Sequence, residues 1–257
     1  PCVDAILERT DYPHFEVLIL DNQSTCIKTL DYMRDISCRD DRVRVLRWNE
    51  PFNYSAINNY GALYARGEIL GLVNNDIEPI NSDWLCEMVR QVCRPEIGCV
   101  GAKLYYPNDT VQHGGVILGL GGVAGHSHKH FHRDHPGYFY RLKLVQNLSA
   151  VTAACLLLRK SVFEQVGGLN EENLPIAFND VDLCLKVRKA GYRNLWTPYA
   201  ELYHHESVSR GADDNPAKRA RANSEVAYMR RTWSKALDDD PAYNPNLTLD
   251  YEDFSLR

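Results

Sequence analysis

Residues 70–79, Leu-Gly-Leu-Val-Asn-Asn-Asp-Ile-Glu-Pro, form an apolar run that ends abruptly in a polar cluster with two carboxylates. This pattern is typical of a buried strand that delivers acidic side chains to the edge of a sheet. In an open α/β sheet, ligands bind beyond the carboxyl ends of the strands, so we expect Asp76 to meet a ligand. Carboxylate and amide oxygens suit Mg²⁺ or Mn²⁺, particularly where phosphate completes the coordination. A strand followed by a plain Asn/Asp turn is the alternative interpretation.

The segments before this stretch alternate between strand and helix patterns. The predicted elements are strands at 15–20 and 43–46 and helices at about 29–36 and 55–65. Ser55 is the expected N-cap of the second helix, and Gly67 the residue that closes it. The alternation predicts an α/β fold with a mostly parallel central sheet, right-handed crossovers and flanking helices.

Strand and helix patterns also follow Pro79. The predicted elements are helices at about 84–93, 161–166, 180–190 and 217–237, strands at 98–104 and 150–158, and one more strand before His204. Asp180 lies where a helix begins, and a carboxylate there is stabilised by free backbone N–H groups, so an N-cap is one interpretation of it. Asp182 is expected to support the helix start. The last twenty residues predict an irregular tail on the surface.

The composition indicates an ordinary globular protein. The 257 residues are 44% hydrophobic and 25% charged, which is enough for a substantial core. The net charge of −5 gives no support to nonspecific nucleic-acid binding. Neither a membrane-spanning apolar run nor a signal-peptide pattern is visible, and the eight scattered cysteines read as reduced thiols. We therefore expect a cytoplasmic protein, with the inner face of the membrane as the alternative place.

Five of the nine histidines lie in residues 126–135. If this tract is extended, alternation places the rings at 126, 128, 130 and 132 on one side. A His-rich tract is a candidate transition-metal site. A mobile loop over an active site is the other interpretation, because residues 112–125 before it are rich in glycine.

Five motifs in order resemble glycosyltransferase family 2, which has the GT-A fold. They are Leu18-Ile19-Leu20-Asp21-Asn22, Phe52-Asn53-Tyr54-Ser55-Ala56-Ile57-Asn58, Val73-Asn74-Asn75-Asp76, Phe178-Asn179-Asp180-Val181-Asp182-Leu183-Cys184, and His204-His205-Glu206-Ser207 to Arg210-Gly211. The resemblance implies a transferase domain over 1–211, with a nucleotide-binding part to about residue 104 and an acceptor-binding part over 105–211. Residues 212–257 are expected to form a helix and a tail packed on the same domain.

The resemblance also implies roles for individual residues. Asp180 matches the catalytic base, Asp76 the metal-binding carboxylate, and His204 the histidine that closes the metal or diphosphate site. His205 is the alternative, because the doublet leaves the register open. The implied contacts to the nucleotide-sugar are Asp21, which would bind the uracil or ribose, Asn53, Asn58, Asn75, Asp76, and Arg210, which would contact the leaving phosphates.

The implied reaction is transfer of a sugar from a UDP- or dTDP-sugar to a carbohydrate or lipid-linked acceptor, with inversion at the anomeric carbon, in bacterial surface-polysaccharide synthesis. Mn²⁺ or Mg²⁺ would stabilise the leaving diphosphate, and a carboxylate would deprotonate the acceptor. Two other functions stay open: a non-catalytic carbohydrate- or partner-binding domain, and a nucleotidyltransferase. The first strand of the family, with its Pro-x-Tyr-Asn-like turn, is expected upstream of this chain, and other domains of a longer protein are expected partners.

Overall fold

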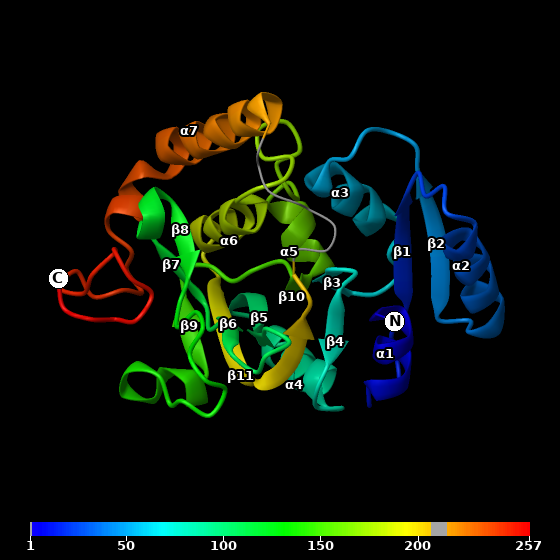
Figure 1. Cartoon of the computed structure of the whole chain (residues 1–257), viewed down its shortest axis with the longest axis horizontal. Helices are drawn as coiled ribbons and strands as arrows, with labels where there is room; N and C mark the ends of the chain where they lie inside the picture. Colours follow the sequence, from blue (N-terminus) through cyan, green and yellow to red (C-terminus); the bar gives the residue numbers. More distant parts are fainter. Residues whose placement is uncertain (1, 207–214) are drawn as a thin grey trace.

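The computed structural model describes residues 2–206 and 215–257 (Figure 1). The helices are α1 Cys2–Arg9, α2 Ile27–Arg39, α3 Tyr54–Tyr64, α4 Trp84–Val92, α5 Lys160–Gln165, α6 Asn179–Lys189 and α7 Pro216–Asp238, with short 3₁₀ helices η1 Leu120–Gly122 and η2 Tyr138–Lys143. The strands are β1 Val17–Asn22, β2 Val43–Trp48, β3 Ile69–Val73, β4 Ile77–Pro79, β5 Ile97–Tyr105, β6 Val111–His113, β7 Val116–Leu118, β8 Ala124–His126, β9 Gln146–Leu148, β10 Cys155–Arg159 and β11 Arg193–His204.

The central sheet has the strand order β3-β10-β5-β11-β4, with β6 on β5 and β9 on β11. β5 and β11 run parallel, while β10 runs antiparallel to both β3 and β5. β1 and β2 pair in parallel in a separate two-stranded sheet, which lies with α2 at the right of Figure 1. The predicted α/β class is confirmed. The antiparallel insertion of β10 shows that strand and helix patterns do not reveal strand direction.

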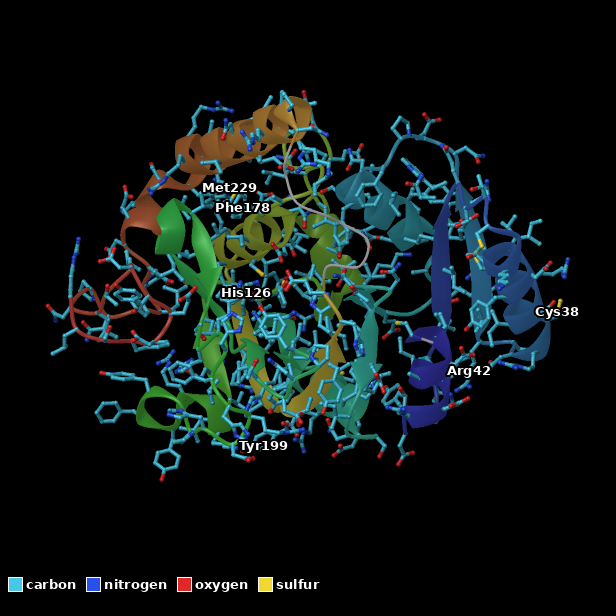
Figure 2. All side chains as sticks on the ribbon, viewed as in Figure 1. Cys38, Arg42, His126, Phe178, Tyr199 and Met229 are labelled. Atoms are coloured by element: carbon cyan, nitrogen blue, oxygen red, sulfur yellow. The ribbon has the colours of Figure 1, made fainter. Side chains whose placement is uncertain are left out.

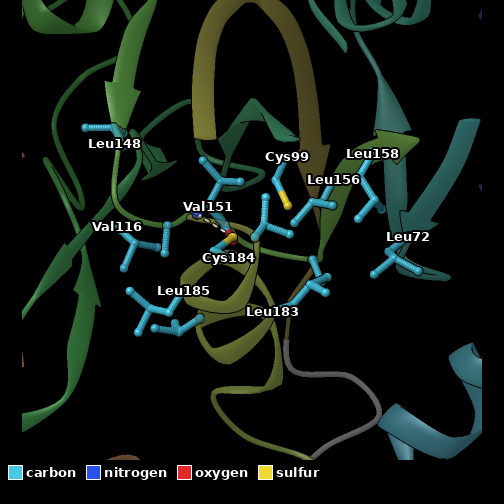
Figure 3. Packing of buried hydrophobic residues seen from close by; sticks show 14 of the residues in the cluster. Leu72, Cys99, Val116, Leu148, Val151, Leu156, Leu158, Leu183, Cys184 and Leu185 are labelled. Carbon is cyan, nitrogen blue, oxygen red and sulfur yellow. Dashed lines mark hydrogen bonds between the residues drawn. The ribbon is translucent and has the colours of Figure 1, made fainter. Parts of the chain in front are cut away.

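Alternate side chains of the central strands pack on the two faces of the sheet. In β5, Cys99 and Tyr105 join one core cluster with Leu183 of α6, and in β10 so does Leu156. The intervening residues face the other way, where they pack with Met88 of α4. This alternation is the two-residue period of a strand buried on both faces. Figure 3 shows the α6 side, where residues of β10 and α6 meet.

Three local expectations are wrong. β10 begins at Cys155, so residues 150–154 are not part of the strand predicted over 150–158. Asn53 caps α3, because its side chain accepts the hydrogen bond that satisfies a free N–H of the first turn, whereas Ser55 lies inside the helix. That helix ends at Tyr64 with an extended C-cap residue, so Gly67 does not close it.

The C-terminal segment packs on the same body as the sheet. Met229 of α7 is fully buried in the core cluster of α6. Beyond α7, the buried Asp240 accepts a hydrogen bond from the backbone N–H of Leu118 at 3.0 Å. Within the described ranges, no helix has both the length and the apolar content to cross a bilayer. β5 and β11 pair across the expected boundary near residue 104 between the nucleotide-binding and acceptor-binding parts. That boundary stays a prediction.

Gly98→Ala tests the packing between β5 and α6. A Cβ at Gly98 would lie 2.1 Å from Cγ1 of Val187, so this variant is expected to lose about 1–3 kcal/mol of unfolding free energy. Gly71→Ala in β3 is the matched control, because its Cβ would make an ordinary 3.6 Å contact. The control should be neutral or slightly stabilising. Urea unfolding measures both, and equal effects would contradict the packing described.

Candidate active site

Asp76 and His204 meet where β3 and β11 end and β4 begins. β4 pairs antiparallel with β11 so that Ile77 lies opposite His204. This register brings Nε2 of His204 within 3.1 Å of Oδ1 of Asp76. The ring of His205 points the other way, where its Nε2 lies 2.9 Å from Oε2 of Glu78. The strand alternation therefore selects His204 as the histidine beside Asp76.

The neighbours of His204 define its tautomer. Nε2 of Gln112 donates to Glu206 at 3.0 Å, which directs Oε1 of Gln112 toward Nδ1 of His204 at 2.6 Å. An amide oxygen can only accept a hydrogen bond, so Nδ1 of His204 must carry the proton and donate it. The other nitrogen, Nε2, then has one lone pair, with Nδ2 of Asn74 at 3.2 Å and Oδ1 of Asp76 at 3.1 Å. Two lone pairs facing each other repel, so a positive charge between Nε2 and Oδ1, either a proton or a cation, stabilises this contact.

The Asp76–His204 pair has the donor set that a divalent cation requires. Oδ1 of Asp76 is buried and has no hydrogen-bond partner within residues 2–206 and 215–257. Contact with His204 lowers the pKa of the Asp76 carboxyl, against the opposing effect of burial. Nowhere in the described ranges do three His, Cys, Asp or Glu side chains gather in a metal-binding cluster. The protein therefore offers two ligand atoms here, as is usual for Mg²⁺ sites that substrate phosphates complete.

Asp180 is held at the start of α6. Its Oδ1 accepts from the backbone N–H of Val181 at 2.8 Å, and its Oδ2 from that of Ala153 at 3.0 Å. The N-cap position belongs to Phe178, which adopts a left-handed backbone conformation, so Asp180 is not the N-cap. The carboxylate lies at the positive end of the helix, where backbone N–H groups are free. The carboxylate is thus fixed in orientation and keeps further lone pairs for a ligand.

Residues 152–154 join the two carboxylates. Ala153 binds Asp180 through its N–H, and the carbonyl of Ala154 accepts from the N–H of Asn74 at 3.0 Å. The hydroxyl of Tyr54 on α3 donates to the carbonyl of Ala153 at 3.2 Å. One irregular segment therefore contacts the Asp76 turn, the start of α6 and α3. The sequence pattern assigned this segment to a core strand, which concealed its part in the site.

A pair of histidines, the buried His113 and the half-buried His126, lies beside Asp180. Nδ1 of His113 is 2.7 Å from Nδ1 of His126, and Nε2 of His113 accepts from the N–H of Thr152 at 3.4 Å. Burial lowers the pKa of both imidazoles, while the charge of Asp180 opposes the shift at His126. The pair is therefore neutral at pH 7, with Nδ1–H of His113 donating to His126. His126, near the middle of the molecule in Figure 2, keeps its proton on Nε2.

The remaining histidines of the tract at 126–135 do not share one side. His128 and His130 have positive φ, so the chain turns and the extended arrangement is wrong. His128 is buried and stacks on Phe254 of the tail at 4.7 Å between ring centroids. His130 is exposed. Only His126 of this tract belongs to the candidate site.

Asp21 is buried at the end of β1, in the two-stranded sheet. Its carboxylate forms an ion pair with Arg47 and accepts from the N–H of Ser24 at 3.1 Å. Burial alone would raise the pKa of Asp21, but the hydrogen bonds from Ser24 and Arg47 outweigh it and lower the pKa. Asp21 therefore has partners within the protein, and its contact with a nucleotide stays a prediction.

The other predicted nucleotide-sugar contacts stay predictions too. Asn53 caps α3, and Nδ2 of Asn58 donates to the carbonyl of Tyr54 one turn earlier, at 2.8 Å. Asn75 is exposed on the turn beside Asp76. Arg210 lies outside the described residues.

A polar cavity of about 390 Å³ lies between α3, α6 and α7. It is bordered by Asp182, Lys186 and Tyr228, and Asp180 is not among its lining residues. Oδ1 of Asp182 accepts from the indole N–H of Trp233 at 2.8 Å. Asp182 thus joins α6 to α7, its expected support of the helix start stays a prediction, and the cavity is separate from the Asp76–His204 pair.

Gln112 and His113 are site residues that sequence reasoning missed. Both are buried in β6, a strand of three residues. The available signal was a pair of polar side chains directly after a valine and before two glycines. Buried polar groups need partners, so such a pair inside an apolar context indicates a buried hydrogen-bond network.

The Asp21–Arg47 pair predicts a pH-dependent stability. Because the folded-state pKa of Asp21 is lowered, its contribution is present above the unfolded pKa of about 3.9 and is lost as pH falls through the folded pKa. Asp21→Asn should lower unfolding free energy by about 1–3 kcal/mol at pH 7. Urea unfolding at several pH values should find this difference shrinking below about pH 4.

Asp35→Asn, at an exposed carboxylate on α2, is the control and should change little at any pH. A difference between wild type and Asp21→Asn that stays constant down to pH 2 would contradict the ion pair.

Comparison with known proteins agrees with this geometry. A family model, glycosyl transferase family 2, matches residues 1–167. An uncharacterised protein of Sinorhizobium fredii is 58% identical over 99% of the chain and 28% of its own length. The O-antigen biosynthesis protein RfbC of Myxococcus xanthus is 42% identical over 99% of the chain and 20% of its own length. The chain thus spans less than a third of either relative.

A solved mannosyltransferase from Pyrobaculum calidifontis, in complex with GDP-Man and Mn²⁺, has the same fold. It superposes with a TM-score of 0.63 at 18% identity, over 94% of this chain and 60% of the other. The expected GT-A fold is thereby confirmed. With the family model covering well over half of its residues, the chain belongs to glycosyl transferase family 2.

Proposed function

We propose that this chain is the catalytic domain of a metal-dependent, inverting glycosyltransferase. The donor is a UDP- or dTDP-sugar, and the acceptor is a hydroxyl of a carbohydrate or a lipid-linked sugar in bacterial surface-polysaccharide synthesis. The observation that carries the proposal is the position of Oδ1 of Asp76, which has no hydrogen-bond partner among the described residues and lies 3.1 Å from Nε2 of His204. Residues 152–154 join the Asp76 turn to Asp180. The O-antigen biosynthesis relative supports the biological setting.

Asp76 and His204 are the residues that would hold Mn²⁺ or Mg²⁺. When bound, the cation supplies positive charge that stabilises the leaving diphosphate. Gln112 orients the imidazole by accepting the proton of Nδ1, which leaves Nε2 for the cation, and the amide of Asn74 lies 3.2 Å from Nε2. Such partners orient a ligating histidine and set its tautomer. The Mn²⁺ in the mannosyltransferase structure supports a divalent cation in this fold.

Asp180 is the proposed general base. An acceptor hydroxyl has a pKa far above 7, so a positioned carboxylate must take its proton during attack on the anomeric carbon. The two backbone N–H groups fix the carboxylate without using all of its lone pairs. With one base and attack opposite the leaving group, the configuration inverts. The Nε2–H of His126 is the proposed donor to an oxygen of the acceptor on this side.

The metal assignment predicts nucleotide binding that depends on both Mn²⁺ and Asp76. Calorimetric titrations with UDP, dTDP and GDP, each with and without Mn²⁺, should find one nucleotide that binds at least about tenfold more tightly with the cation. Asp76→Ala should abolish this gain. Glu78→Gln is the matched control two residues away, because Glu78 pairs with Arg9 and His205 instead.

Equal Mn²⁺ dependence in the wild type and Asp76→Ala would contradict the assignment of the metal to Asp76. Absence of binding to all three nucleotides would favour the alternative function, a carbohydrate- or partner-binding domain. Release of pyrophosphate from a nucleoside triphosphate would instead favour a nucleotidyltransferase.

Asp180→Asn separates binding from transfer. The amide keeps the size of the side chain but cannot accept the proton, so the transfer rate should fall about 10²–10⁴-fold. The calorimetric affinity for the nucleotide should stay close to that of wild type. Release of nucleoside diphosphate from the matching sugar-nucleotide measures the rate. Transfer that persisted in Asp180→Asn would show that another group is the base.

A further inference from the structure

An exposed aromatic loop follows β8 and the histidine-rich tract in the chain. Residues 138–145 read Tyr-Phe-Tyr-Arg-Leu-Lys-Leu-Val and include η2. Phe139 is 82% exposed, Tyr140 67% and Leu144 53%. Tyr199, at the bend of β11 in Figure 2, is also exposed and donates through its hydroxyl to the carbonyl of Lys143 at 3.3 Å. We call residues 138–145 with Tyr199 the aromatic loop.

The base of the aromatic loop is fixed to the core. Leu142 is fully buried, and its carbonyl accepts from the ammonium of Lys103 at 3.1 Å. The N–H of Tyr138 donates to Nε2 of the buried His128, and the Tyr138 ring stacks on Phe254 of the tail. The exposed rings are therefore held out by a well-packed support, and their exposure is not a consequence of a poorly anchored segment.

The backbone of the loop is strained in a way that favours this exposure. Phe139 and Tyr140 have φ of +46° and +63°, a region that bulky residues rarely adopt. Such conformations persist only where the surroundings impose them, and they are concentrated at functional positions. Glycine or asparagine would suit this turn better, so two aromatic residues here point to a use for the rings.

The aromatic loop itself carries basic side chains and no carboxylate. Residues 135–145 contain Arg141 and Lys143 but no Asp or Glu, and the guanidinium of Arg141 lies over the ring of Phe254 at 5.0 Å. Exposed aromatic rings beside basic side chains are the composition found at the headgroup level of membranes, where the ring is amphipathic and the cation meets an anionic lipid.

We propose that the aromatic loop docks this chain on the headgroup layer of an anionic phospholipid bilayer. Phe139, Tyr140 and Leu144 enter the interface, while Lys143 contacts lipid phosphates. The strained turn presents the rings outward and the charge is complementary to the lipid. The inference does not depend on the transferase reaction, because it concerns a surface formed by η2 and the bend of β11.

Co-sedimentation with vesicles tests the proposal. Vesicles of phosphatidylcholine with phosphatidylglycerol should bind the chain, and pure phosphatidylcholine or high salt should weaken binding because the attraction to anionic lipid is screened. Phe139→Ser/Tyr140→Ser should lower the partition coefficient at least about tenfold, and Lys143→Glu should weaken binding to anionic vesicles alone. Ile27→Ser is the matched control, since Ile27 is 74% exposed on α2, which lies apart from η2 in Figure 1.

Three results would overturn the proposal. The wild type could fail to bind anionic vesicles, or the double variant could bind as well as wild type. Alternatively, sedimentation velocity could find a dimer that the double variant disperses, which would make the loop an interface between two copies. Thermal melting identifies any variant that has not folded, and the single Lys143→Glu variant then provides the test. No donor or acceptor is needed, so failure here is distinct from failure of the transferase assignment.

Discussion

The antiparallel pairing of β4 with β11 is the contact on which the candidate site depends. Only three residues of each strand take part, and they place His204 opposite Ile77, directly after Asp76. Asn74 and His204 are 130 residues apart in the chain, yet their side chains lie 3.2 Å apart. A shift of one residue would exchange His204 for His205, since side chains alternate along a strand. The short β4 thus selects which histidine faces the carboxylate.

The polar groups around this contact form a connected network inside an apolar core. Gln112 holds His204, and His113 holds His126, so that each buried nitrogen has a defined role as donor or acceptor. Burying such groups is costly unless they are hydrogen-bonded, which is why a satisfied network also fixes orientation. Oδ1 of Asp76 is the exception that matters, because it is buried without a hydrogen-bond partner among the described residues. A buried carboxylate oxygen without a hydrogen-bond partner is a suitable ligand for a cation.

The stretch between β5 and β9 supplies several of the groups around the candidate site. It supplies Gln112 and His113 from β6, His126 from β8, and then the aromatic loop over 138–145. The loop is tied to the C-terminal tail through Tyr138 and Phe254. Family folds of this kind carry their chemistry on strand ends and their specificity on connecting segments. In the proposed transferase, this one stretch would serve both the acceptor side and the membrane surface.

The sequence by itself determined the features that depend on near neighbours. The apolar run before Asp76 could be read as a strand ending in a carboxylate, and the helix beginning near Asp180 followed from its periodicity and polar start. Both assignments rest on patterns within about ten residues, where local geometry dominates. The five motifs in order indicated the family, which none of the motifs specifies alone.

Tertiary structure decided everything that depends on distant partners. It determined that β10 enters antiparallel between β3 and β5, that residues 152–154 join Asp180 to the Asp76 turn, and that Asp21 pairs with Arg47. The physical reason is that strand order and hydrogen-bond partners are set by contacts between residues far apart in the chain, on which hydrophobic periodicity carries no information. The sequence could therefore place the carboxylates at strand and helix ends, but only packing could bring them to one site.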